Sequence, residues 1–197
     1  MGQIPKGLIV SLHGWGANAD DLASLSPFFN LPDYQFIFPN APFPFPDSSF
    51  GRAWYDLRRE NMYEGLGESR QILIDWLKTL ESSTGVPLSR TILSGFSQGG
   101  AMTLDVGLTL PLAGLICMSG YLHPDAAKNV ETQNMNSLPS VLITHGRQDT
   151  VVPLQAAMRA RETLESLKVA VEYHEFDMGH EVRPEMLEIV RNFVVNL

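Results

Sequence analysis

One short turn constrains the fold of this chain more than any other feature. An apolar, strand-type run at Thr91–Leu93 leads into Gly95-Phe96-Ser97-Gln98-Gly99, and a helix-type run of small and apolar residues begins at once. So tight a turn forces its central residue to a positive φ and leaves little room on either side, where glycine is the least strained residue. Ser97 would then stand clear of the strand, beside a helix N-terminus whose partial positive charge favours an oxyanion. The turn predicts a strand–turn–helix unit that presents a nucleophilic serine.

Strand-type and helix-type segments alternate along the rest of the chain. Short apolar runs bounded by turn residues indicate buried strands, and the segments between them carry apolar residues at helical spacing. This alternation predicts an α/β fold with a mostly parallel central sheet and helices on both faces. At 197 residues, we expect a single domain spanning 1–197. The expected strands are 7–12, 34–38, 91–93, 115–118, 141–144 and 171–176, and the expected helices are 20–29, 64–82, 98–110, 153–168 and 184–195. Asp20 and Asp21 are the candidates for the cap of the first of these helices.

Two connections stand out from this pattern. The segment 42–61 opens with alternating prolines, Pro42, Pro44 and Pro46, which exclude a helix or a central strand. We expect a long ordered loop there, of the kind that carries function in a compact domain. The polar stretch 124–138 is interpreted as a surface connection.

Composition excludes several classes of function. A formal net charge of −8 argues against a nucleic-acid partner, which would need clustered Lys and Arg. No run approaches the about 20 apolar residues of a membrane span, and Gly7–Leu12 is too short for a signal peptide. The single cysteine, Cys117, excludes an intramolecular disulfide and fits a reducing compartment. We therefore expect a soluble, cytoplasmic protein.

Three residues at strand ends suggest a catalytic triad. Function in parallel sheets collects at the carboxyl ends of strands, and Ser97, Asp149 and His180 each follow an expected strand. A serine hydroxyl needs a base to take its proton, and the base needs a third group to hold its tautomer. The order serine, acid, histidine is the order found in α/β-hydrolases.

Other residues compete for these roles. Asp149, just after a strand, could simply cap a helix or complete a turn, and a lone histidine in a loop is usually polar surface. The alternative bases have plainer explanations, in strand-ending His-Gly pairs (His13, His145), beside a proline (His123) or within a strand (His174). The alternative acids cluster beside the proposed base instead of arriving from another strand: Glu175, Asp177 and Glu181.

A tetrahedral intermediate also needs two amide donors. The residue after the nucleophile, Gln98, supplies one backbone N–H, and Trp15 in the loop after the first strand is placed to supply the other. The plainer reading of Trp15 is a core aromatic residue. Because the donor is its backbone amide, both readings are compatible.

Seven sequence blocks together resemble the phospholipase/carboxylesterase family, which includes acyl-protein thioesterases and small bacterial carboxylesterases. The resemblance implies an α/β-hydrolase fold without a large cap domain, the triad Ser97–Asp149–His180, oxyanion amides from Trp15 and Gln98, and no metal or organic cofactor. Family members often have Leu where Trp15 stands, so the acyl site is expected to be narrower, and little room precedes residue 7 for the family's usual first strands. The blocks are 12–18, 38–42, 53–56, 95–100, 119–121, 145–153 and 179–180.

The expected function is that of a serine hydrolase which cleaves carboxylic (acyl) esters through an acyl-enzyme, like a carboxylesterase or lysophospholipase. The alternatives are an acyl-protein thioesterase, a peptidase or deacetylase on the same scaffold, and a binding protein without activity. The partner would be a small-molecule or lipid-like acyl ester. The sequence leaves monomer and homodimer equally open.

An aromatic cluster is the candidate for the acyl-binding slot. Phe43, Phe45, Phe50 and Trp54 fall in or next to the proline-rich loop and could line an apolar pocket together with Trp15. The alternative is that these rings form the internal core of the loop.

Overall fold

The computed structural model describes residues 5–126 and 138–197, so most of the expected surface connection 124–138 lies outside the described residues. Six strands form one parallel sheet in the order β2-β1-β5-β6-β7-β8. This arrangement confirms the predicted α/β class. The strands are β1 (Gly7–Leu12), β2 (Tyr34–Ile37), β5 (Thr91–Phe96), β6 (Gly114–Met118), β7 (Ser140–Gly146) and β8 (Val171–Phe176).

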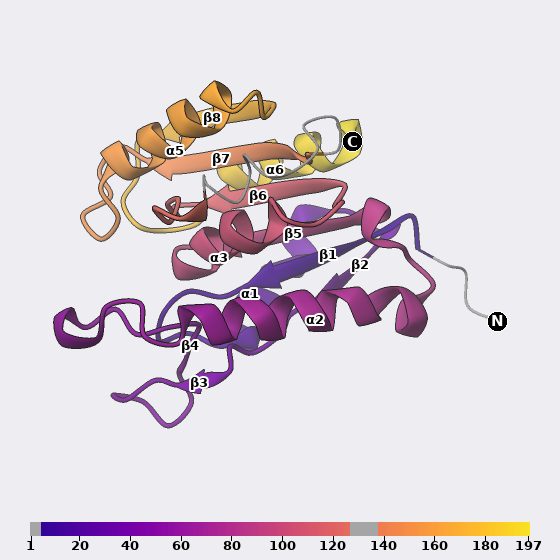
Figure 1. The fold of residues 1–197 in the computed structure, drawn as a ribbon. Helices are drawn as coiled ribbons and strands as arrows, with labels where there is room; N and C mark the ends of the chain where they lie inside the picture. Colours follow the sequence, from indigo (N-terminus) through magenta and orange to yellow (C-terminus); the bar gives the residue numbers. More distant parts are fainter. Residues whose placement is uncertain (1–4, 127–137) are drawn as a thin grey trace.

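Helices cover both faces of the sheet (Figure 1). In the view of Figure 1, α2, α3 and α5 lie in front of the sheet, and α6 lies behind it together with the 3₁₀ turn Ser26–Phe29. Successive strand residues point to opposite faces, so in β5 Leu93 joins the core under α2, α3 and α5, and Ile92 joins the core under α6. The helices are α1 (Ala19–Ala23), α2 (Leu66–Thr84), α3 (Gln98–Gly107), α5 (Leu154–Ser166) and α6 (Pro184–Asn196).

The predicted helix 20–29 is shorter than expected and is capped differently. The helix α1 begins at Ala19, and Asn18 accepts a hydrogen bond from the Asp20 amide at 2.8 Å. The Asp21 carboxylate accepts from the Asn18 amide at 2.8 Å, which completes a capping box. The N-cap is therefore Asn18, and Asp21 acts from the third helical position.

The proline-rich segment folds back on itself at the carboxyl edge of the sheet. Two-residue strands β3 (Phe43–Pro44) and β4 (Arg52–Ala53) pair antiparallel, where a pure loop was expected. The prolines are tolerated because this hairpin stands apart from the six-stranded sheet. The Arg52 guanidinium donates to the carbonyls of Ala41 and Pro42 at 2.9 and 2.8 Å, which ties the hairpin to the end of the preceding segment.

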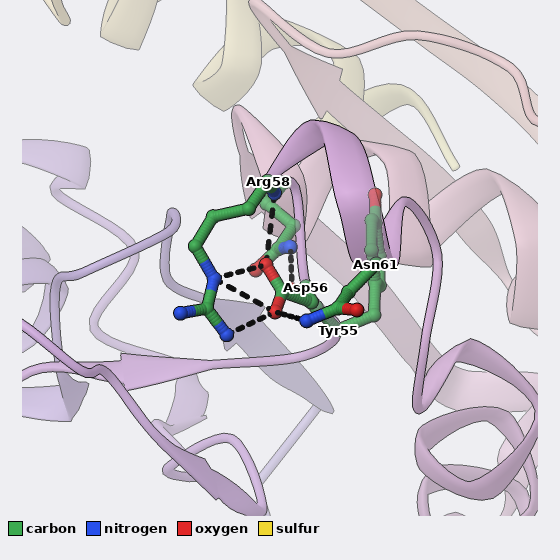
Figure 2. A network of polar contacts seen from close by, with 5 residues as sticks. Tyr55, Asp56, Arg58 and Asn61 are labelled. Atoms are coloured by element: carbon green, nitrogen blue, oxygen red, sulfur yellow. Dashed lines mark hydrogen bonds and ion pairs between the residues drawn. The ribbon is translucent and has the colours of Figure 1, made fainter.

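A carboxylate organises the loop that follows β4 (Figure 2). Asp56 accepts hydrogen bonds from the backbone and guanidinium N–H groups of Arg58 and from the Asn61 amide. These bonds, above all those from the Arg58 side chain, hold the pKa of the Asp56 carboxyl well below its usual range. The backbone of Asp56 also exchanges hydrogen bonds with Tyr63 and Glu64 at 2.9 Å each. The loop therefore leaves the adjacent Tyr55 in a fixed place at the edge of the sheet.

Candidate active site

The turn after β5 has the strained geometry that its sequence predicts. Ser97 has φ 57° and ψ −117° and stands directly before α3. The flanking glycines are required by close approach: a Cβ on Gly95 would lie 2.2 Å from the Gly99 carbonyl oxygen, and one on Gly99 would lie 2.0 Å from the Leu12 carbonyl oxygen. The turn thus holds α3 against both β5 and β1 and leaves Ser97 at the edge of the sheet.

The structure brings the three predicted side chains together. His180 Nε2 lies 2.9 Å from Ser97 Oγ, and His180 Nδ1 lies 2.6 Å from Asp149 Oδ2. Because an ionised carboxylate only accepts hydrogen bonds, Nδ1 carries the hydrogen and Nε2 is left to accept the serine proton. Asp149 follows β7 and His180 follows β8, so the line of contacts runs across three strand ends.

Asp149 serves the turn as well as the histidine. Its Oδ1 accepts from the backbone N–H groups of Val151 and Val152 at 2.9 and 2.8 Å, as a turn-forming aspartate does. His145 Nε2 lies 2.8 Å from the Val152 carbonyl oxygen and 3.4 Å from Asp149 Oδ2. The orientation of the Asp149 carboxylate is therefore fixed by its own turn, independently of His180.

The loop after β1 is anchored so that the Trp15 amide is fixed. Buried His13 accepts from the Ala41 amide through Nε2 at 3.0 Å and donates from Nδ1 to the Gly14 carbonyl at 2.8 Å. Burial lowers the pKa of His13, which keeps the ring neutral and able to accept. The Trp54 indole donates to the His13 carbonyl at 2.9 Å. His13 thus positions the loop, in agreement with the plainer reading of its sequence.

The backbone amide of Gln98 is the second donor, and hydrogen bonds made by the Gln98 side chain fix the position of this residue. Oε1 of Gln98 accepts from the Trp54 amide at 3.0 Å, and Nε2 donates to the Tyr55 carbonyl at 2.8 Å. In the part of the chain that the structure describes, the backbone N–H groups of Trp15 and Gln98 donate to no other group. Both amides are therefore free for an oxyanion.

A cavity of about 460 Å³ opens beside these groups. A volume of this size suits a small ligand and not a large polymer. Apart from Ser97, His180 and Gln98, most of its walls are apolar. The other described lining residues are Gly14, Trp15, Ala17, Leu57, Phe96, Tyr121, Val151 and Val152.

The aromatic residues predicted to form the acyl slot are dispersed. Trp54 is only 2% exposed and packs in the core, which corrects its assignment to the slot. Phe50 is 81% exposed and lines none of the described cavities, which corrects a second assignment. Phe45 packs edge-on against Trp15 at a centroid distance of 5.0 Å, and Phe43 lines a neighbouring cavity of about 370 Å³. Trp15 belongs to the walls of both cavities.

Sequence reasoning missed the residues that replace them. Leu57, Tyr121, Val151 and Val152 line the cavity beside Ser97. A signal existed for three of the four, because Tyr121 follows the Ser119-Gly120 pair after β6, and the two valines follow Asp149. Leu57 comes from the long loop and has no comparable signal.

The rival acids and bases are engaged elsewhere. Each makes contacts that account for it without the serine. Glu175 and Asp177 bind Arg147, Glu181 binds Arg183, His174 binds Glu172, and the buried His123 contacts Asp105 and Tyr55.

Neither a cluster of metal-ligating side chains nor a membrane-spanning helix is found among the described residues. Across residues 5–126 and 138–197, no group of three or more His, Cys, Asp or Glu side chains is placed to hold a metal ion. Among the helices of these same ranges, none combines the length and the apolar character needed to cross a membrane.

Comparison with known proteins agrees with this geometry. The sequence model of the Phospholipase/Carboxylesterase family matches residues 2–197 of this chain. Acyl-protein thioesterase 1 of Neurospora crassa is 30% identical in an alignment 200 positions long, and this alignment covers 92% of this chain and 80% of that protein. The crystal structure of esterase PE8 superposes with a TM-score of 0.86 at 32% identity, covering 98% of this chain and 93% of that chain. Acyl-protein thioesterase 2 of Zea mays shares the fold, with a TM-score of 0.80 at 22% identity over 98% of this chain and 94% of that chain. The chain therefore belongs to the phospholipase/carboxylesterase family of serine ester hydrolases.

Proposed function

We propose that this protein cleaves carboxylic (acyl) esters through an acyl-enzyme, with Ser97 as nucleophile, His180 as base and Asp149 as the group that orients the base. The observation that carries the proposal is the hydrogen-bonded line Asp149–His180–Ser97, with contacts of 2.6 and 2.9 Å, at a serine with a positive φ. A hydroxyl in this setting is activated as a nucleophile.

The reaction proceeds in two halves. Ser97 Oγ attacks the ester carbonyl carbon while its proton passes to His180 Nε2, and the resulting oxyanion accepts hydrogen bonds from the amides of Trp15 and Gln98. The C–O bond to the alcohol then breaks, and His180 returns the proton to the leaving oxygen. Water repeats the sequence on the acyl-enzyme, with His180 taking its proton and returning it to Ser97, and so releases the acid.

The cavity walls favour an apolar acyl group. Leu57, Val151 and Val152 supply aliphatic surface beside Ser97. The neighbouring cavity, on the other side of the shared Trp15, also has charged groups in its walls, among them Asp56 and Glu68. An acyl chain therefore gains more from the side of the valines, where apolar area can be buried.

Thioesters are the second candidate substrate. The curated relative from Neurospora crassa is named an acyl-protein thioesterase, and a thioester carbonyl would be attacked by the same three groups. We expect oxygen esters to be the better substrates, and kcat/KM on an oxygen ester and a thioester of one acyl chain decides between the two. A peptidase or deacetylase would instead favour amides or acetylated sugars over acyl esters.

The test of the proposal is kcat/KM on p-nitrophenyl esters of increasing acyl length. In wild type we expect activity that rises toward medium chains, and in Ser97→Ala a loss of about 10⁴-fold or more. Ser83→Ala is the matched control, because this hydroxyl bonds only within α2, to the Thr79 and Leu80 carbonyls. Activity that survives in Ser97→Ala would exclude Ser97 as the nucleophile.

Labelling addresses the remaining alternative. A fluorophosphonate that modifies wild type but not Ser97→Ala would exclude a binding protein without activity. A cytoplasmic location and the choice between monomer and homodimer stay predictions.

A further inference from the structure

A line of polar side chains runs through the interior from α2 to the active-site cavity. The Arg70 guanidinium donates to both carboxylate oxygens of Asp105, at 2.7 and 2.9 Å. His123 Nδ1 lies 3.6 Å from Asp105 Oδ1, and His123 Nε2 lies 2.9 Å from Tyr55 Oη. Tyr55 Oη in turn lies 2.6 Å from Tyr121 Oη. We call these five residues the Arg70–Tyr121 chain.

The Arg70–Tyr121 chain is mostly buried, and none of its five residues belongs to the proposed triad. Asp105, His123 and Tyr55 are each no more than 1% exposed. Polar groups buried to this degree are costly unless they have partners, so hydrogen bonds between them restrict the arrangement they can adopt. The last member of the Arg70–Tyr121 chain, Tyr121, is partly exposed and lines the cavity beside Ser97.

Among the described residues that line this cavity, Tyr121 carries a hydroxyl that the proposed triad does not use. Among the described lining residues, Ser97 and His180 belong to the proposed triad, and the Gln98 amide group is engaged with Trp54 and Tyr55. In a largely apolar pocket, one placed polar group decides how a substrate is oriented and which substrates are favoured.

The hydrogen on His123 follows from its neighbours. Nδ1 lies 3.6 Å from the Asp105 carboxylate, a contact longer than a hydrogen bond. A lone pair on Nδ1 would face the negative charge of the carboxylate, so Nδ1 carries the hydrogen. The charge of Asp105 is already matched by Arg70. A second hydrogen, on Nε2, would place an extra positive charge in the interior, which is strongly unfavourable. His123 is therefore neutral, and its Nε2 accepts a hydrogen bond.

The two tyrosines then have no hydrogen to spare. Burial raises the pKa of Tyr55 well above its ordinary value and the pKa of Tyr121 to about 12, so both phenols keep their protons at neutral pH. Tyr55 donates its hydrogen to His123 Nε2, and Tyr121 donates its hydrogen to Tyr55 Oη. The opposite order would set two lone pairs face to face at 2.9 Å between Tyr55 and His123. The Tyr121 oxygen is left with lone pairs alone.

We propose that Tyr121 is a specificity-determining residue that offers the cavity a hydrogen-bond acceptor, and that His123 and Tyr55 are positioning residues that fix this polarity. The favoured substrates are acyl esters that carry a hydroxyl or an amide N–H close to the scissile group. The inference rests on the proposed function, because it assumes that the cavity beside Ser97 binds the ester.

The test compares matched esters that differ in one donor group. On the acyl side the pair is p-nitrophenyl 3-hydroxybutyrate and p-nitrophenyl 3-methylbutyrate. On the alcohol side the pair is 2-hydroxypropyl butyrate and 2-methylpropyl butyrate. In wild type we expect kcat/KM to favour the hydroxyl-bearing member of at least one pair by about 10-fold, since a buried acceptor left unpaired by the methyl member is costly.

Removing the acceptor should remove this preference. In Tyr121→Phe we expect the ratio of kcat/KM within the favoured pair to fall to about one. Tyr63→Phe is the matched control, because the Tyr63 ring packs against Tyr55 and His123 at centroid distances of 5.7 and 5.5 Å while its hydroxyl takes no part in the chain. That variant should keep the wild-type ratio.

A second variant separates positioning from mere packing. His123→Phe keeps a ring in place but removes the acceptor for Tyr55, which then donates to Tyr121 and turns the Tyr121 hydrogen toward the cavity. A substrate hydroxyl can also accept, so this variant is tested with a group that only accepts, in the pair p-nitrophenyl 3-methoxypropanoate and p-nitrophenyl pentanoate. Wild type should not favour the ether, because its oxygen would meet the lone pairs of Tyr121, whereas His123→Phe should favour it by several-fold. A packing defect would instead lower kcat/KM for both members of this pair equally. A wild-type ratio near one in both hydroxyl pairs, or a ratio unchanged in Tyr121→Phe, would overturn the inference. Activity retained in Ser97→Ala, measured in the same assay, would instead overturn the proposed function.

Discussion

At the scale of single residues, each carboxylate oxygen of Asp149 has a different task. Oδ1 accepts from two backbone amides of its own turn, and Oδ2 accepts from His180. These contacts fit both the plain interpretation of Asp149 as a turn former and its proposed catalytic role. The division makes it possible to change the second task while leaving the first.

Asp149→Asn should separate the two tasks. The amide oxygen can still accept from Val151 and Val152, but the amide N–H₂ would face His180 Nδ1 and favour the tautomer with its hydrogen on Nε2. That tautomer cannot accept the serine proton, so we expect kcat to fall by about 10³–10⁴-fold on p-nitrophenyl esters. Asp177→Asn, an exposed carboxylate bound to Arg147, is the control. A kcat within tenfold of wild type would show that Asp149 does not orient the base.

At the scale of elements, the position of α3 depends on the absence of side chains at its first turn. A Cβ on Gly99 would lie 2.0 Å from the Leu12 carbonyl oxygen, in the backbone of β1. Backbone cannot move aside as a flexible side chain can. The close packing of α3 on β1 therefore also fixes the distance between Ser97 and the loop that holds Trp15.

Two Gly→Ala substitutions in helices should have opposite effects. Gly99→Ala forces α3 away from β1 and should lower the free energy of unfolding by about 1–3 kcal/mol, as overpacking does. Gly67→Ala, in the exposed first turn of α2, places its Cβ where no atom lies within 4 Å, and it should raise the same quantity by about 0.5–1 kcal/mol. Urea unfolding of both variants measures the difference. Equal effects would mean that close approach is not the reason for Gly99.

At the scale of the whole molecule, one buried histidine links stability to pH. Burial lowers the pKa of His13, which accepts a hydrogen bond from Ala41 in its neutral form. In the unfolded chain His13 takes a proton as pH falls through about 6.5, whereas in the folded protein it resists protonation until a lower pH. The unfolded state then binds more protons, so acid favours unfolding.

We accordingly expect the free energy of unfolding to be lower at pH 5.5 than at pH 7.5, by at most about 1.4 kcal/mol per pH unit from this one group. In His13→Gln, which keeps an acceptor for the Ala41 amide, the difference between the two pH values should shrink. Urea unfolding at both pH values measures it, with His174→Gln, a partly exposed histidine paired with Glu172, as the control. An equal difference in wild type and His13→Gln would contradict the role assigned to His13.

The class of the fold and the candidate nucleophile, acid and base could be predicted from the amino-acid sequence. Strand and helix periodicity is local, and the need for glycine at position 95 arises within the turn itself, where a Cβ would meet the Gly99 backbone. The carboxyl ends of parallel strands share one edge, so residues after β5, β7 and β8 could be expected to meet. Asn18 replaced the expected aspartate cap of α1 because several neighbouring residues could cap, and the choice depends on side-chain geometry.

Which residues of the long loop face the site depends on tertiary packing and could not be predicted from the sequence. Trp54 and Phe50 have the composition of a pocket wall, yet one lies in the core and the other in solvent, because the hairpin β3–β4 sets the direction of each side chain. The Arg70–Tyr121 chain likewise could not be predicted from the sequence. Its members Tyr55 and Tyr121 are 66 residues apart, and a contact across that separation depends on how distant segments pack, which local patterns do not encode.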